Sequence, residues 1–276
     1  MNEPLPVFFY SLTQVLGGIL PFPVHSMQEV LRSVFVDNGV SLETLQLGKI
    51  CVLLAILFRF RHDILSQIVS VIRIAAERRR PETVDETIPL LYFCTLVPVI
   101  VVGFFLRSDE VLQQLSDHGW IMHLLGVIAG LVVIWVETRM NHSKTFVYWS
   151  VLEASLVGTI CIFSNLPFLT FMTAAFMIGR FRGFRLEALL KFALICSLPL
   201  QIAYVFAEWN GTRAIIDGST PIAMAVTALT SIGATWLFLS ILTGNRPPLR
   251  LTKLGVLNVL VSGGALFLWF RAHSGS

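Results

Sequence analysis

The sequence predicts an all-α, polytopic membrane protein, and three observations predict it. Of the 276 residues, 55% are hydrophobic and only 13% are charged. The mean hydropathy is +0.76, and the apolar residues come in long blocks that are typical of transmembrane helices. Basic residues cluster in short loops between these blocks, where they set the orientation of the chain. The net charge of +3 is too small to indicate a nucleic-acid partner.

The first apolar block, residues 5–24, cannot be an ordinary membrane helix. Gly17, Gly18, Pro21 and Pro23 fall within seven residues of it, and proline breaks a helix interior. No base precedes the block and no small-residue cleavage site follows it, so we expect it to belong to the mature protein. With a second limb through about residue 35, the segment near 5–36 is predicted to be a re-entrant helical hairpin.

The charges of the loops then predict in which direction the next segments cross the membrane. After a block at 45–60, the loop 59–80 carries six arginines against Asp63 and Glu77, so the positive-inside rule places it in the cytoplasm. Its middle, residues 62–76, is predicted to be an interfacial amphipathic helix. The chain then crosses outward through 88–106 and returns through 120–136.

The following block, 146–179, is 34 residues long, whereas about 20 residues span a bilayer. Both of its ends are basic. If both ends are cytoplasmic, the block must enter the membrane and return, turning near residues 164–167. The last three blocks, 188–207, 221–243 and 254–270, then alternate out, in and out.

Each half of the chain therefore shows the same plan. Residues 1–140 and 141–276 each form one re-entrant helical hairpin plus three transmembrane helices. Because three is odd, the second half enters from the opposite side, which predicts an inverted-topology repeat with a site near the membrane midplane. The alternative is a pair of proline-kinked helices with ordinary packing.

Several segments resemble the undecaprenyl-pyrophosphate phosphatases of the BacA/UppP family, and the likeness runs over most of the chain. "LPFPVHS" (20–26) stands where that family has Leu-Pro-Val-Ser-Ser. "LVPVIVVGFFL" (96–106) is similar to its Ile-Pro-Ala-Val-Val-Leu-Gly-Leu segment, and "AAFMIGRFR" (174–182) to its Gly-Met-Leu-Met-Gly-Val-Ser-Arg. The resemblance implies an integral membrane enzyme with two re-entrant hairpins in inverted repeats.

The residues that carry the family's chemistry differ here. Its two hairpin glutamates correspond to Gln14 and Gly18, and no arginine stands in the second hairpin, where the closest match to Ser-Arg is Ser164-Asn165. A diphosphate site without these groups leaves about two or more negative charges poorly compensated. Hydrolysis by the family's mechanism is therefore not expected, and neither a metal nor a cofactor is predicted.

The remaining polar residues are candidates because ionisable groups are costly inside a membrane. Glu153 is predicted to lie opposite Gln14 and to bind a lipid head group or relay a proton; alternatively Ser150, Ser155 or Tyr148 satisfies it near the interface. His25 and Ser26 are predicted to replace the family's His and Ser as an anion or proton site, or else to cap the following helix.

Two arginines complete the set of candidates. Arg180 and Arg182, at the mouth of the second hairpin, are placed to attract lipid phosphates, although topology alone accounts for them. His123, one turn into a span, is interpreted as an interfacial packing residue. Glu137 and Arg139 are interpreted as a solvated pair at a helix end.

The predicted function is binding or translocation of a polyprenyl (pyro)phosphate or related lipid across a bacterial inner membrane. Two alternatives stay open. The first is an enzyme acting on an isoprenoid or lipid-linked substrate with a rebuilt site made of Gln14, His25, Glu153 and Asn165, and Ser164 is a further candidate for substrate binding. The second is a non-catalytic subunit of an envelope-assembly complex. The expected partner is a membrane lipid of isoprenoid type, and either a homodimer or an envelope-biosynthesis partner is compatible with the sequence.

Overall fold

The computed structural model describes residues 4–20, 22–35, 42–78, 80–106, 119–139, 150–162, 170–207, 221–243 and 251–274. The regular structure of these residues is helical, which confirms the predicted all-α class. The helices, in chain order, are α1 (Pro4–Ile19), α2 (Val24–Val34), α3 (Leu42–Arg59), α4 (Arg61–Glu77), α5 (Val84–Leu106), α7 (Gly119–Arg139), α8 (Val151–Cys161), α9 (Phe171–Phe181), α10 (Leu186–Ala207), α12 (Pro221–Thr243) and α13 (Leu251–His273).

All six blocks predicted to cross the membrane are helices. Within the described residues, four of them are long and apolar enough to do so, namely those at Gly119–Arg139, Leu186–Ala203, Pro221–Leu242 and Thr252–His273. The other two predicted spans coincide with α3 and α5. The chain is therefore a multi-pass membrane protein by the length and composition of its helices.

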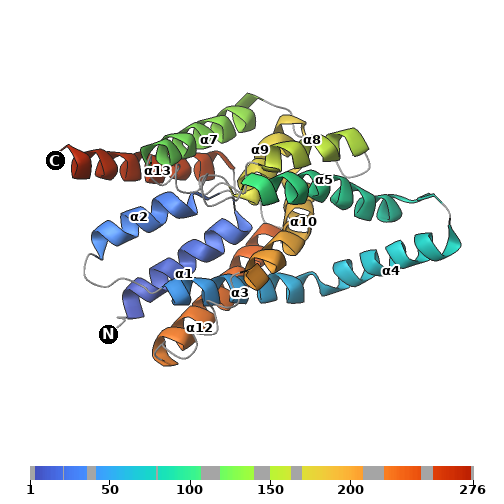
Figure 1. Cartoon of the computed structure of the whole chain (residues 1–276), viewed down its shortest axis with the longest axis horizontal. Coiled ribbons are helices and arrows are strands. Elements are labelled where there is room, and N and C mark those ends of the chain that lie inside the picture. Colours follow the sequence, from blue (N-terminus) through green and yellow to red (C-terminus); the bar gives the residue numbers. More distant parts are fainter. Residues whose placement is uncertain are drawn as a thin grey trace.

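Four shorter helices form two consecutive pairs. α1, which ends at Ile19, packs against α2, which begins at Val24, and α8 packs against α9. At 1.5 Å per residue, the eleven residues of each of α2, α8 and α9 reach about 16 Å, roughly half of a bilayer core of about 30 Å. Figure 1 shows α1 and α2 side by side. Such lengths suit re-entrant limbs, although the hairpin placement and the inverted repeat stay predictions.

The hydrophobic core is centred on α9 and α10. Phe176, Phe184 and Phe192 are all fully buried there, among side chains from α1, α3, α5 and α8. A close approach at Gly158 joins α8 to α5, because a Cβ at this position would lie 2.3 Å from the carbonyl oxygen of Thr95. Glycine lets membrane helices approach this closely.

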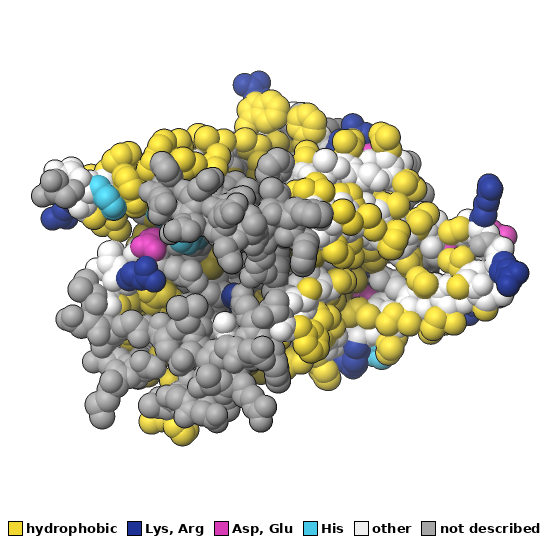
Figure 2. Space-filling model, in the orientation of Figure 1, with side chains coloured by type: hydrophobic (Ala, Val, Ile, Leu, Met, Phe, Trp, Pro, Cys, Tyr) yellow, Lys and Arg dark blue, Asp and Glu magenta, His cyan; other side chains and the backbone are white. Residues whose placement is uncertain are grey.

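α4 leaves the bundle as an arm. It extends at the end of the molecule opposite to the start of α1 and the end of α13 (Figure 1), and none of its residues is buried. Its exposed apolar residues include Leu65, Ile68 and Ile72, and Figure 2 shows hydrophobic side chains along this arm with Lys and Arg at its end. The predicted helix at 62–76 is confirmed, and its position at the membrane surface stays a prediction.

Candidate functional site

The first turn of α2 carries two of the predicted site residues into a buried contact. α2 begins at Val24, and its N-cap is Pro23, which makes no side-chain cap hydrogen bond. His25 and Ser26 therefore lie inside the helix rather than before it, and the alternative that they cap the helix is wrong. The Ser26 hydroxyl instead lies 3.1 Å from Nδ1 of His123 on α7.

His25 completes this group, which we call the Ser26–His123 cluster. The rings of His25 and His123 stack with centroids 5.6 Å apart and an interplanar angle of 14°. Ser26 and His123 are only 3% and 2% exposed. The His123 side chain is therefore buried, and its ring nitrogen has a hydroxyl partner that its interpretation as a packing residue did not include; its position at the membrane interface stays a prediction.

Glycines in α7 allow α2 and α13 to pack closely against it. A Cβ at Gly126 would lie 2.5 Å from the Ser262 hydroxyl of α13 and 3.7 Å from that of Ser26, so α2 and α13 both approach α7 at this residue. One turn further, a Cβ at Gly130 would lie 2.9 Å from the carbonyl oxygen of Gly255. Small residues in such a seam let membrane helices approach closely. Behind it, Ser262 donates to Oδ1 of buried Asn258 at 3.3 Å.

The cluster has the chemistry of an anion site. The first N–H groups of a helix lack intrahelical partners, so the start of α2 is a ready site for a phosphate oxygen. The Ser26 hydroxyl and the two imidazoles add further hydrogen-bond donors, and each imidazole becomes a cation when protonated. A serine hydroxyl within hydrogen-bond reach of a histidine nitrogen is also the arrangement that activates a nucleophile.

Arg180 forms an ion pair with Glu137, outside this cluster. Its Nη2 lies 2.7 Å and 2.6 Å from the two carboxylate oxygens of Glu137, and its Nε donates to Glu137 at 2.9 Å. Its Nη1 donates to the carbonyl oxygen of Phe184 at 2.9 Å. The prediction that Glu137 is merely solvated beside Arg139 is wrong, since α7 and α9 are tied together through Glu137 and Arg180.

Glu153 and Arg182 are brought together by the structure. Arg182 Nη2 lies 2.7 Å from Oε1 of Glu153, whose side chain is 6% exposed. Glu153 also forms a capping box with Ser150: its N–H donates to the Ser150 hydroxyl at 3.2 Å, and its Oε2 accepts from the Ser150 N–H at 3.1 Å. These bonds place Glu153 at the start of α8 and favour the local alternative over a pairing with Gln14.

Gln14 lies on α1, where this helix packs against α3. It is 8% exposed, and its Cγ would be 3.7 Å from a Cβ at Gly48 of α3. Ser164 and Asn165 lie outside the described residues. In the part of the chain that the structure describes, no three His, Cys, Asp or Glu side chains come together to hold a metal ion. The predicted residues thus fall into separate groups: His25 and Ser26 with His123, Arg180 with Glu137, and Glu153 with Arg182.

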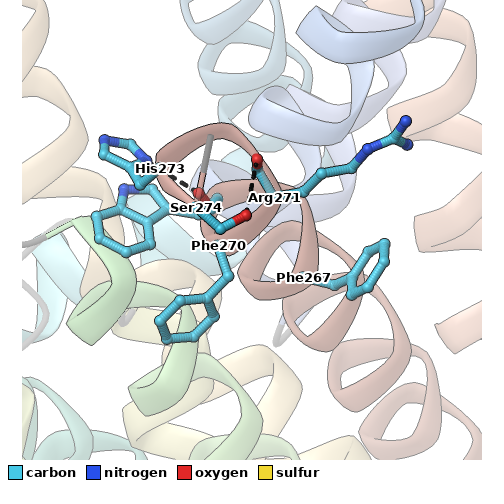
Figure 3. A pocket seen from close by; sticks show the side chains of 6 residues that line it. Phe267, Phe270, Arg271, His273 and Ser274 are labelled. Carbon is cyan, nitrogen blue, oxygen red and sulfur yellow. Dashed lines mark hydrogen bonds between the residues drawn. The ribbon is translucent and has the colours of Figure 1, made fainter. Parts of the chain in front are cut away.

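A shallow pocket at the end of α13 is not a comparable site. It is lined by Phe267, Trp269, Phe270, Arg271, His273 and Ser274. Figure 3 shows that the labelled aromatic and basic side chains radiate away from the helix. The hydrogen bonds drawn there are local: the His273 ring nitrogen contacts the carbonyl oxygen of Trp269, and Ser274 donates to that of Arg271. No polar groups of this pocket converge on one point, as they would in a ligand site.

Comparison with known proteins gives matches that agree with one another. The family model described as bacitracin resistance protein BacA matches residues 25–249. The chain is 26% identical over 210 residues to an undecaprenyl-diphosphatase of Roseobacter denitrificans, which covers 71% of this chain and 74% of that protein. It is 25% identical over 195 residues to an undecaprenyl-diphosphatase of Jannaschia sp., covering 68% and 71%. A third undecaprenyl-diphosphatase, from Anaeromyxobacter sp., is 26% identical over 182 residues, covering 66% of this chain and 58% of that protein.

Proposed function

Because this chain belongs to the family of the bacitracin resistance protein BacA, we propose that it binds the phosphorylated head group of a polyprenyl lipid at the Ser26–His123 cluster. Its relatives are named for a diphosphatase of undecaprenyl lipids, which gives the substrate class. The relatives are bacterial proteins, and the chain has helices suited to crossing a membrane, so the proposed location is a bacterial inner membrane.

One observation carries the proposal: Ser26 lies in the first turn of α2 with its hydroxyl 3.1 Å from His123 Nδ1. This places a hydroxyl, an imidazole and the first N–H groups of a helix at the point where the first broken segment ends. These are the donors that recognise phosphate oxygens. His25, stacked on His123, supplies a second imidazole whose protonation would offset the charge of the ligand.

Binding and translocation are proposed ahead of hydrolysis because the groups that neutralise a diphosphate are missing or engaged. Gln14 and Gly18 stand where the resemblance places glutamates. Arg180 in α9 and Arg182 at its C-cap are already paired with Glu137 and Glu153. The site is thus a degenerate one, which holds a head group without the charges that stabilise a departing phosphate.

Movement of the lipid would follow from the two short-helix pairs. If α1–α2 and α8–α9 are re-entrant hairpins of an inverted repeat, a head group held near their tips is exposed alternately to the two sides. Direct packing of α1 against α9 supports this arrangement, because it brings the first pair against the second.

Ligand-induced stabilisation tests the binding proposal. We expect undecaprenyl phosphate to raise the unfolding temperature of the detergent-purified protein, since a ligand at 100 times its Kd stabilises by about 2.7 kcal/mol. Ser26→Ala and His123→Gln should remove most of this increase. Ser33→Ala, an exposed position on the same helix, is the matched control and should keep it. Equal stabilisation of all four proteins would refute the assignment of the site.

A second candidate function, hydrolysis, is favoured by the same hydroxyl–imidazole contact. In that reaction Ser26 Oγ attacks the terminal phosphorus of a polyprenyl pyrophosphate while His123 takes the hydroxyl proton. The bond from that phosphorus to the bridging oxygen breaks, polyprenyl phosphate leaves, and water then releases inorganic phosphate from the serine. The tautomer of His123 with Nδ1 as acceptor is required.

Phosphate release separates the two candidates. The binding proposal predicts no inorganic phosphate from undecaprenyl pyrophosphate and a divalent ion above a no-protein control. Turnover of about 1 per second, within the range of ordinary enzymes, that disappeared in Ser26→Ala would establish the second candidate instead.

A further inference from the structure

Three hydroxyls lie on one face of α12, well away from the cluster described above. Thr227, Ser231 and Thr235 recur at every fourth position and are all 0% exposed. Among the described residues, none of their hydroxyl oxygens has a hydrogen-bond partner. We call these residues the α12 hydroxyl row.

This row differs from other buried or helical hydroxyls of the same molecule. A serine or threonine in a helix normally donates to the carbonyl oxygen four residues earlier. Such bonds, 2.7 to 2.9 Å long, are made by Ser11, Thr13, Thr95, Thr138 and Thr159. The hydroxyls of the α12 row make no such bond.

Thr227 and Ser231 of this row lie where α12 packs against α3, beside Gly48. Both α1 and α3 pack against α12 and against each other. A Cβ built at Gly48 of α3 would lie 3.5 Å from the Ser231 hydroxyl and 3.7 Å from both Thr227 Cγ2 and Gln14 Cγ. These are ordinary van der Waals distances. The absent side chain of Gly48 therefore leaves about the space of a methyl group, bordered by an unpaired hydroxyl and by Gln14.

Leaving these groups unpaired would be costly. An unsatisfied buried hydroxyl costs about 1–3 kcal/mol, and the row has three of them inside a protein of marginal stability. A small polar molecule that pairs with them removes this cost. A single metal ion does not fit the whole row, because eight residues of helix spread the hydroxyls over about 12 Å, whereas even Ca²⁺ holds its oxygen ligands at about 2.3–2.6 Å.

We propose that the α12 hydroxyl row binds a file of water molecules that extends to Gln14. Buried water typically makes about three hydrogen bonds to otherwise unsatisfied polar groups, and neutral hydroxyl and amide oxygens suit it. α1 packs against α2 on one side and against α3 and α12 on another, so it separates this hydrated track from the Ser26–His123 cluster. The membrane interior of the protein then holds two polar compartments.

Water-edited solid-state NMR of the full-length protein in lipid vesicles tests this proposal. Samples labelled at threonine and serine report how fast water protons transfer magnetisation to each side chain. Thr95 is the matched internal control, because it is equally buried at 0% exposure but its hydroxyl lies 2.9 Å from the carbonyl oxygen of Leu91 and 3.1 Å from that of Ala154. We expect transfer to Thr227, Ser231 and Thr235 to be several-fold faster than transfer to Thr95.

Equal, slow transfer to Thr95 and to the row would overturn the proposal. A variant gives a second measurement: Thr227→Val keeps the shape of the side chain and removes its hydroxyl, so it should interrupt the file and slow transfer to Ser231. If Thr227→Val leaves transfer to Ser231 unchanged, the continuous file is refuted. Should this variant fail to fold, the comparison within the unmodified protein still decides.

Discussion

The pair formed by Arg180 and Glu137 makes the sharpest stability prediction, through the substitution Glu137→Gln. The two side chains are 10% and 16% exposed, and their closest atoms are 2.6 Å apart. Glutamine keeps the shape and one acceptor oxygen but removes the negative charge. The guanidinium of Arg180 would stay buried, with the carbonyl oxygen of Phe184 as its remaining strong acceptor.

The magnitude follows from the burial of the pair. Removing one partner of a buried pair costs about 3–5 kcal/mol because the other charge is left uncompensated. The retained oxygen of glutamine offsets part of this, so we expect a loss of about 2–4 kcal/mol. At about 2–4 °C per kcal/mol for a chain of this size, the unfolding temperature should fall by roughly 4–16 °C.

A second ion pair provides the control. Lys191 and Asp63 are also 2.7 Å apart, but their side chains are 44% and 40% exposed. Asp63→Asn should therefore cost under about 1 kcal/mol. Thermal unfolding of the purified protein, followed by tryptophan fluorescence, compares the two variants. The double variant Glu137→Gln with Arg180→Gln should recover part of the loss, since neither charge is then left alone. Equal decreases of the unfolding temperature for Glu137→Gln and Asp63→Asn would refute the reasoning from burial.

Three further predictions concern other parts of the molecule. The free energy of unfolding of Glu153→Gln should lie within about 1 kcal/mol of that of the parent, because glutamine also suits a capping box. Glu153→Leu should lower it by about 1–2 kcal/mol, and equal losses in the two variants would contradict the cap. Gly130→Ala should cost about 1–3 kcal/mol by overpacking the α7–α13 seam, whereas Gly263→Ala, which meets nothing within 4 Å, should be neutral or slightly stabilising in the same thermal unfolding assay. Cysteines introduced at Arg78 and Arg185, which are both exposed, should react with a membrane-impermeant thiol reagent from the same side; labelling from opposite sides would exclude the second hairpin and the repeat with it.

Much of the fold was predictable because it depends on local properties of the chain. Proline and glycine interrupt helices wherever they occur, so the break between α1 and α2 was visible in "LGGILPFP". Apolar blocks and the arginines between them indicated the spans, and the polar spacing of residues 62–76 indicated α4. The excess length of 146–179 likewise indicated two short helices, which are α8 and α9.

The candidate site was only half predictable. His25 and Ser26 were selected because they stand beside the first break, where the resemblance places a functional His and Ser. His123 was not selected, although a histidine inside an apolar span is itself a signal of function. Its distance of 97 residues from Ser26 in the sequence gave no indication that the two meet.

By itself, the sequence determined the helical membrane class, the family, and the positions where helices break. Only the tertiary structure decided the partners: Ser26 with His123, Arg180 with Glu137, and the face of α12 that is buried. The physical reason lies in the solvent. A membrane helix such as α7 or α12 is apolar toward lipid and toward protein alike, so its hydropathy does not reveal which face turns inward. That rotation is fixed by close packing at glycines such as Gly126 and Gly130, and it determines which polar side chains meet.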